Sequence, residues 1–308
     1  MLDGVTLDQL RVLVAVAETG SFRAAAKRIR RVQSAVSHAI ATLESQLGVT
    51  LFDRSRQRPE MTPEGRALLA DARAVLLRMD VMRARARGLG EGVELDVSLV
   101  VDTLFPVKAL AHALARLRDA YPSVAVHLRA APLGEPLVAL REGRCTLAIT
   151  VGEEFREPRI ELEALTPVPF VAVVAAQHAL ADRGDHPAPL DPADLAEHLQ
   201  IVLEDATART AGKDFGVLSP GTWRVSGQDI KHAMIREGLG WGRLPLWAVE
   251  DDLAAGRLHR LDVAALGRHG RVDLEAYLAH RRDQPLGPAA RVLRAGLLSH
   301  LQGQPAHD

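Results

Sequence analysis

The sequence predicts two parts of different fold class: an all-α N-terminal part that ends in a long helix, and a larger α/β part. Over residues 1–92 apolar side chains recur with helical periodicity, and short apolar strands alternate with helices after that point. The charge divides there too: residues 1–92 carry 15 Lys and Arg against 10 Asp and Glu, a net of +5, which leaves −6 for the remainder of a chain whose total is −1. This asymmetry is expected when only one end of a protein meets phosphates.

Three short helices are predicted first. Ser21 can cap the second helix, Phe22–Ile29, and the third spans Gln33–Leu47. The first helix ends near Gly20, and the third stops at Gly48. The predicted buried faces are Leu7, Leu10, Leu13, Val14 and Ala17 in the first helix, and Val36, Ile40, Leu43 and Leu47 in the third.

The other face of the third helix carries small or polar side chains: Gln33, Ser34, Ser37, His38 and Ala41. Polar side chains near the start of such a helix can hydrogen-bond base edges in a major groove, although a merely solvated face has the same periodicity. Flanking cations favour the DNA interpretation, because they would anchor phosphates. These cations are Arg23, Lys27, Arg28, Arg30 and Arg31 before the helix, and Arg54, Arg56 and Arg58 after it.

The stretch SFRAAAKRIRRVQSAVSHAIATLESQLGVTLFDRSRQRPEMTPEGRALL resembles the signature of LysR-type transcriptional regulators nearly end to end. The resemblance implies a winged helix-turn-helix. The DNA-binding residues it implies, together with the flanking cations, are Arg23, Gln33, Ser34, Ser37, His38, Arg54 and Arg56. The family usually has Ser or Thr where Val32 stands, so either a cap worth about 1 kcal/mol is missing or Ser34 caps a helix that starts later.

A long linker helix follows. Thr62 can cap it, Pro63 suits its first position, and Gly88 and Gly90 are expected to end it after Arg87. Apolar residues at alternating spacings of four and three form a coiled-coil seam: Leu68, Ala72, Val75, Met79, Met82 and Ala86. A single helix lying on its own domain would show a similar pattern. By resemblance this is the dimerisation helix, with Leu68, Val75, Met79 and Met82 in the contact of a homodimer or homotetramer.

Beyond residue 92 the alternation of strands and helices predicts a parallel α/β sheet. The motifs RDAYPSVAVHL, ALREGRCTLAI, AAQHALA and REGLGWGRLP resemble the LysR effector domain, although Thr146 replaces the family's usual Asp. This implies a periplasmic-binding-protein-like domain of two Rossmann-like lobes with a cleft between them. Predicted strands are Glu94–Val101, Val124–Leu128, Leu147–Ile149, Leu165–Ala175, Gln200–Leu203, Trp223–Ser226, Leu258–Leu261 and Val272–His280. Predicted helices are Phe105–Ala120, Glu135–Glu142, Leu190–His198, Ile230–Glu237 and Gly287–Leu301.

Ligands of open α/β sheets bind beyond the carboxyl ends of the strands. The effector-binding candidates at those ends are Asp102, Thr103, Leu133, Gly134, Gly152, Glu204, Trp241 and Arg243. Asp102, Glu204 and the adjacent Asp205 would oppose an anion, whereas Arg243 would attract one, so both cationic and anionic effectors stay open. Some of these residues could instead be ordinary caps or surface groups.

The predicted domains are a winged helix-turn-helix at 1–62, a linker and dimerisation helix with hinge at 63–92, an effector-binding domain at 93–302 and a flexible tail at 303–308. The lone Cys145 is expected to be a buried thiol, and we predict neither a metal site nor a cofactor beyond the effector. No apolar run approaches the roughly 18 residues of a membrane helix, and no signal-peptide core is evident, so a cytoplasmic protein is expected.

The expected partners are double-stranded DNA, a small-molecule effector and further copies of the chain, with RNA polymerase as an additional candidate. Three alternatives compete with a ligand-responsive regulator. A solute-binding protein would lack the basic head, and an enzyme would need a convergent set of acid, base or nucleophile, which the sequence does not offer. A DNA-binding protein with a vestigial sensor is the nearest rival.

Overall fold

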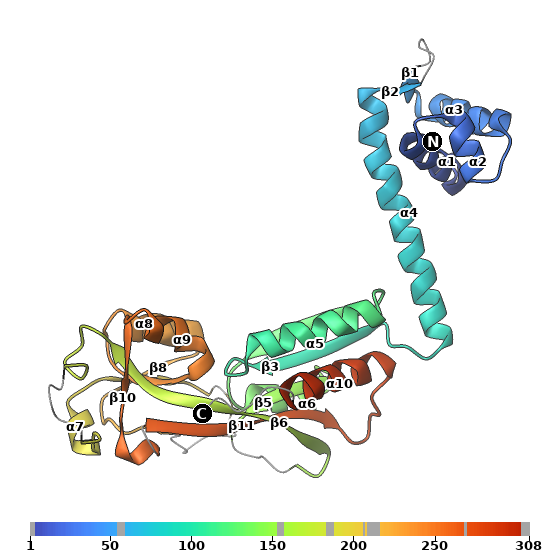
Figure 1. The fold of residues 1–308 in the computed structure, drawn as a ribbon. Helices are drawn as coiled ribbons and strands as arrows, with labels where there is room; N and C mark the ends of the chain where they lie inside the picture. Colours follow the sequence, from blue (N-terminus) through green and yellow to red (C-terminus); the bar gives the residue numbers. More distant parts are fainter. Residues whose placement is uncertain are drawn as a thin grey trace. The chain divides into compact units, whose positions relative to one another are not determined.

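The computed structural model describes residues 4–53, 59–152, 157–182, 188–205, 207, 216–267 and 270–302. It divides into two compact units, Met1–Gly88 and Leu89–Asp308, which are described separately below (Figure 1). The predicted DNA contacts Arg54 and Arg56, the neighbouring Arg58 and the predicted tail at 303–308 lie outside the described residues.

The first unit contains the three predicted helices, α1 (Leu7–Thr19), α2 (Phe22–Arg28) and α3 (Gln33–Leu47). Strands β1 (Phe52–Asp53) and β2 (Glu60–Met61) pair antiparallel as a hairpin, the wing, before the long helix α4 (Pro63–Gly90). Ser21 caps α2, and Gly20 and Gly48 end α1 and α3 in the left-handed conformation. The sequence predicted all three of these capping residues.

The buried face of α1 differs from the predicted one. Val12, Leu13, Ala15 and Val16 are buried, whereas Leu10 and Val14 are only partly covered at the edge of the core. The reason is that α1 contacts both α2 and α3, so the covered face is rotated and wider than a single apolar stripe.

Helix α4 begins as predicted, because Thr62 Oγ1 accepts the backbone N–H of Gly65 at 2.9 Å. It continues past the predicted end at Arg87 as far as Gly90, and the left-handed residue that follows is Gly92, with φ 72°. An isolated glycine costs a helix only about 1 kcal/mol, which the helix-favouring residues before it tolerate. Leu68 and Ala72, from the predicted coiled-coil seam, pack into the core of their own unit.

The second unit is built on a mixed seven-stranded sheet with the order β10-β6-β11-β5-β3-β4, in which β9 also pairs with β6. The strands are β3 (Asp96–Asp102), β4 (Ala125–Ala131), β5 (Leu147–Val151), β6 (Ile160–Ala175), β9 (Gly242–Pro245), β10 (Leu258–Leu261) and β11 (Arg271–Arg281). Only β3, β4 and β5 are mutually parallel here, so the prediction of a parallel sheet is wrong for β6 and its partners. Figure 1 shows the long antiparallel pair β6 and β11 running through both lobes.

The first lobe packs α5 (Val107–Ala120), α6 (Glu135–Arg141) and α10 (Pro288–Gln302) on this sheet. Glu94 joins the start of the lobe to its last helix: its carboxylate accepts the N–H groups of Ala289 and Ala290 at 2.9 and 3.2 Å. This caps the α10 N-terminus, where a negative charge is favourable.

The second lobe contains α7 (Pro192–Ala196), α8 (Gln228–Arg236), α9 (Leu246–Ala254) and the parallel pair β7 (Gln200–Leu203) and β8 (Thr222–Val225). Helix α7 is shorter than the predicted Leu190–His198, because Asp191 and Pro192 start it two residues later. Helix α9 was not predicted. None of the helices in the described part of the chain is long and apolar enough to cross a membrane.

Candidate DNA-reading helix and inter-lobe site

Helix α3 presents its predicted polar face to solvent. Gln33, Ser34 and His38 are exposed and Ser37 is half-buried, whereas the opposite stripe, Val36, Ile40 and Leu43, is fully buried. The helix begins at Gln33, with Val32 as its N-cap residue (φ −79°, ψ 146°) and no side-chain cap. The alternative in which Ser34 caps a later start is therefore wrong, and one backbone donor at the front of this helix has no side-chain acceptor.

Replacing Val32 by threonine is expected to stabilise the first unit by about 1 kcal/mol, because the backbone already has the extended N-cap conformation and lacks only the hydroxyl acceptor. Urea unfolding of the full chain, followed by the helical circular dichroism signal, measures this gain. Val32→Ala is the control, since it removes the exposed apolar side chain without adding an acceptor. Equal gains in both variants would contradict the capping explanation.

The cations that flank α3 fall into two groups. Arg31 forms a bidentate pair with Asp8 at 2.6 and 2.8 Å, and Arg28 pairs with Glu18 at 2.7 Å, so these two link the helices to one another. Arg23, Lys27 and Arg30 are exposed and form no ion pair within the described residues. They are the flanking side chains best placed to meet phosphates.

Two residues outside the predicted set position the wing. The Glu44 carboxylate accepts the backbone N–H groups of Leu51 and Phe52 at 2.8 and 3.2 Å, which ties the wing to α3. Gly65 lets α4 pass the Leu51 carbonyl oxygen, which would lie 2.3 Å from any Cβ at that position. Glu44 and Gly65 both stand in the LysR motif of the sequence, but the spacing of apolar residues does not indicate that either one contacts the wing.

In the first lobe of the second unit, Asp102 connects the loop after β3 to the end of β5. Its buried carboxylate accepts the N–H groups of Leu104 at 3.0 Å and Val151 at 3.3 Å, so it holds the loop after β3 against the end of β5. Burial raises the Asp102 pKa to about 7, against the opposing effect of these hydrogen bonds, and Asp205 from the second lobe raises it further. The strand ends of the two lobes therefore lie within electrostatic range.

Buried polar atoms without partners occur in both lobes. Thr103 Oγ1, directly after Asp102, is buried and has no hydrogen-bond partner in the described part of the chain. The same holds for both amide atoms of Gln228, the first residue of α8, which is 8% exposed. A buried polar group without a partner typically costs about 1–3 kcal/mol, so these atoms require an explanation.

Lys231 lies one turn after Gln228 on the same buried face of α8 and is 6% exposed. Burial lowers its pKa to about 7, and the charge of Arg243 lowers it further. Burial also lowers the pKa of Arg243, whose guanidinium lies 5.9 Å from the centre of the Phe170 ring. Sequence reasoning missed Gln228 and Lys231; the available signal was a lysine four residues before Ile235, on the apolar face.

Other predicted effector contacts are placed differently. Trp241 has no exposed surface, packs in the second-lobe core and donates its indole N–H to Ser219 Oγ at 3.0 Å, so its assignment as an effector contact is wrong. Glu204 is exposed, and Gly134 is the N-cap residue of α6. Leu133 has a left-handed backbone with φ 53°, beside Gly134.

Cys145 is buried as predicted, and burial raises its thiol pKa to about 11. A thiol in this state is protonated at neutral pH and is a poor nucleophile and metal ligand. Among the residues that the structure describes, no cluster of His, Cys, Asp and Glu could hold a metal ion.

A helix-turn-helix with a wing, followed by a long helix and a two-lobed α/β domain, defines a DNA-binding regulator with its own ligand-sensing domain. Residues 7–66 match the family model "Bacterial regulatory helix-turn-helix protein, lysR family", and residues 90–302 match "LysR substrate binding domain". The chain belongs to the LysR family of transcriptional regulators. It is a DNA-binding regulator with an effector-binding domain, and its relatives are regulators and not enzymes.

Similar proteins of known name span nearly the whole chain. The HTH-type transcriptional regulator AceR of Acinetobacter baumannii is 30% identical over 295 residues, 94% of this chain and 95% of that protein. The activator AllS of Klebsiella pneumoniae is 34% identical over 80% of this chain and 90% of its own length. Among solved structures, CrgA from Neisseria meningitidis has a TM-score of 0.53 at 22% identity, covering 98% of this chain and 100% of that one.

Proposed function

We propose that this regulator reads its operator with the exposed face of α3, through Gln33, Ser34, Ser37 and His38. The observation that carries the proposal is that this face is polar and exposed while the opposite face of the same helix is fully buried. Arg23 would hold the phosphate backbone, as would Arg54 and Arg56, which are carried over from the sequence. Base contacts then set the sequence preference and phosphate contacts set the register.

We also propose that the effector binds between the two lobes. It would supply hydrogen bonds to Thr103 Oγ1 and the Gln228 amide, which lack partners in the described structure. The buried Lys231 and the half-buried Arg243 favour an effector with an acidic group, because the Asp102 carboxylate already accepts backbone N–H groups. The proposed effector-binding residues are Asp102, Thr103, Leu133, Gly134, Gly152, Glu204, Gln228, Lys231 and Arg243.

Homodimerisation through α4 is part of the proposal. Of the predicted contact residues Leu68, Val75, Met79 and Met82, Val75 and Met82 are 46% and 58% exposed, and they lie in the part of α4 beyond Leu68 and Ala72, which pack on its own unit. A second set of exposed apolar residues would allow a tetramer: Val107, Val126 and Leu128 in the first lobe, with Trp223, Ile230 and Leu239 in the second. We place the protein in the cytoplasm, with RNA polymerase as a candidate partner of the DNA-bound oligomer.

The combined substitution Ser37→Ala and His38→Ala is expected to weaken operator binding about 10- to 100-fold and to reduce the preference over random DNA. Arg23→Gln should instead weaken binding to all sequences and lower the salt slope by about one. Fluorescence anisotropy with the DNA upstream of the protein's own gene, at several salt concentrations, measures both effects.

Ser45→Ala is the matched control, because Ser45 is exposed on α3 but lies two turns further from the helix start. It should leave the dissociation constant unchanged. The assignment of α3 as the reading helix would be wrong if the double variant kept the wild-type preference for the operator.

A further inference from the structure

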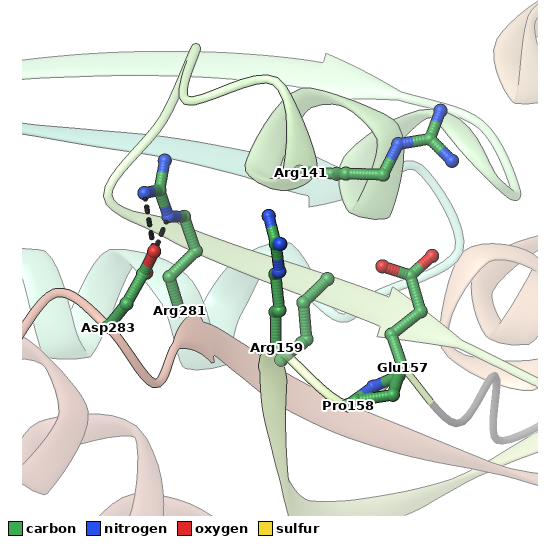
Figure 2. Close-up of a pocket in the computed structure, with 7 residues that line it drawn as sticks. Arg141, Glu157, Pro158, Arg159, Arg281 and Asp283 are labelled. Atoms are coloured by element: carbon green, nitrogen blue, oxygen red, sulfur yellow. Dashed lines mark hydrogen bonds and ion pairs between the residues drawn. The ribbon is translucent and has the colours of Figure 1, made fainter.

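A cavity lies on the first lobe, at the ends of the central strands that are farther from the inter-lobe site. It has a volume of about 650 Å³ and is lined by Arg141 at the end of α6, by Glu157, Arg159 and Ile160 at the start of β6, and by Arg281 at the end of β11 (Figure 2). Leu147, the first residue of β5, pairs with His280 at this edge, whereas Val151, the last, contacts Asp102 at the other. The cavity is therefore separate from the proposed effector site.

The cavity holds more positive than negative charge. Arg281 donates Nε and Nη2 to Asp283 at 2.9 and 3.0 Å, which raises the pKa of Arg281 and lowers the pKa of Asp283. This ion pair fixes the end of β11, and it explains why Arg281 and Asp283 both occur here. Three arginines, Arg141, Arg159 and Arg281, face two acids, Glu157 and Asp283, among the lining residues.

The ion pair of Arg281 with Asp283 does not involve Arg141 or Arg159. Both are exposed, and neither forms an ion pair or side-chain hydrogen bond within the described residues. Figure 2 shows Arg159 between Arg281 and Glu157, with Arg141 reaching across from α6. Arg159 also lowers the pKa of Asp283, although less than Arg281 does, so its charge acts on the same small region. Among the lining residues the arginines exceed the acids by one, so the positive charge of the cavity is not fully balanced by Glu157 and Asp283.

We propose that this cavity binds a compact dianion, a phosphate monoester or a dicarboxylate, as a second ligand of the regulator. The guanidinium forks of Arg141 and Arg159 match carboxylate and phosphate oxygens in a bidentate geometry, and an anion with two negative charges can pair with both forks at once. A cavity of about 650 Å³ has the size of a small-metabolite site. Its walls belong to strands β6 and β11, which run on into the second lobe.

Isothermal titration of the full-length protein at constant ionic strength tests this, with glycerol phosphate and succinate as probes and chloride as the monovalent reference. We expect saturable one-site binding of one dianion, at least ~10-fold weaker in Arg141→Gln/Arg159→Gln. Arg118→Gln is the matched control, because Arg118 is an exposed arginine of α5 that pairs only with Asp119 among the described residues. The tighter of the two probes identifies the phosphate or the carboxylate class.

Three results would overturn the inference. The first is equal binding by the double variant and the wild type, and the second is an effect that chloride reproduces in full. The third is loss of binding in Gln228→Ala, which would assign the anion to the inter-lobe site and leave the proposed function intact. Because operator binding by α3 is a separate measurement, its failure would not affect the anion result. Circular dichroism checks that each variant is folded.

Discussion

Gly65→Ala is expected to destabilise the first unit by about 2–3 kcal/mol and to weaken DNA binding with it. An added Cβ would lie 2.3 Å from the Leu51 carbonyl oxygen and 2.9 Å from Met61 Cγ. The first is a backbone atom in the segment that Glu44 fixes, so it cannot move aside without displacing the wing. The substitution therefore acts on the junction between the wing and α4, and not on the helix itself.

Gly90→Ala is the matched control within the same helix. No atom lies within 4 Å of the added Cβ, so no steric cost is expected, and at the last residue of α4 the gain in helix propensity is below the roughly 1 kcal/mol of a helix interior. The three tryptophans, Trp223, Trp241 and Trp247, all belong to the second unit. During urea unfolding Gly65→Ala should shift the helical circular dichroism transition but leave the tryptophan fluorescence transition unchanged. A fluorescence shift, or a stabilising effect of Gly65→Ala, would contradict this account.

The first unit was predictable because its determinants are local. The Ser21 cap, the stop glycines Gly20 and Gly48 and most of the apolar stripe of α3 lie within a few residues of the elements that they define, and these are confirmed, whereas Leu47 is only partly buried and α4 runs past its predicted end. The face of α1 was misassigned because burial there depends on contacts with two helices that are remote in sequence. Glu44 was missed for the same reason, since its partners are the backbone N–H groups of a later segment.

The second unit shows the limit of strand-by-strand reasoning. Every strand of this unit except β9 was predicted, but strand direction depends on long-range pairing, and β6 and β11 are antiparallel partners about a hundred or more residues apart in sequence. Trp241 was assigned to the ligand from its place in the order of strands and turns, yet it is a core residue. Lys231 was overlooked because a lysine on a short helix is ordinarily solvated, and only packing shows that this one is not.

Lys231→Met is expected to stabilise the second unit strongly at neutral and lower pH. A pKa lowered by burial from 10.5 to about 7 corresponds to at most about 5 kcal/mol of destabilisation when the amine is charged in both states. This penalty is fully present below pH 7. Between about pH 7 and pH 10 the unfolded state binds the extra proton, so the stability of the wild type rises with pH.

The stability gap between Lys231→Met and the wild type should therefore be largest at pH 6.5 and much smaller at pH 9.5. Urea unfolding followed by tryptophan fluorescence reports the second unit, and the difference between the two proteins cancels the titration of all other groups. Lys108→Met is the control, since Lys108 is exposed on α5, and it should show no gap at either pH. A gap of equal size at both pH values would mean that Lys231 acts through its packing and not through its charge.

The buried amine of Lys231 destabilises its own domain when it is charged. A bound anion that neutralises this charge would explain why a lysine is kept at this position. Binding of an acidic effector between the lobes would favour the charged form of Lys231, raise its pKa and draw a proton from solution near pH 8. The same effector should stabilise the wild type more than Lys231→Met, because the variant has no charge to neutralise. An effector that stabilised both proteins equally would bind without Lys231, and Thr103 and Gln228 would then have to account for its recognition.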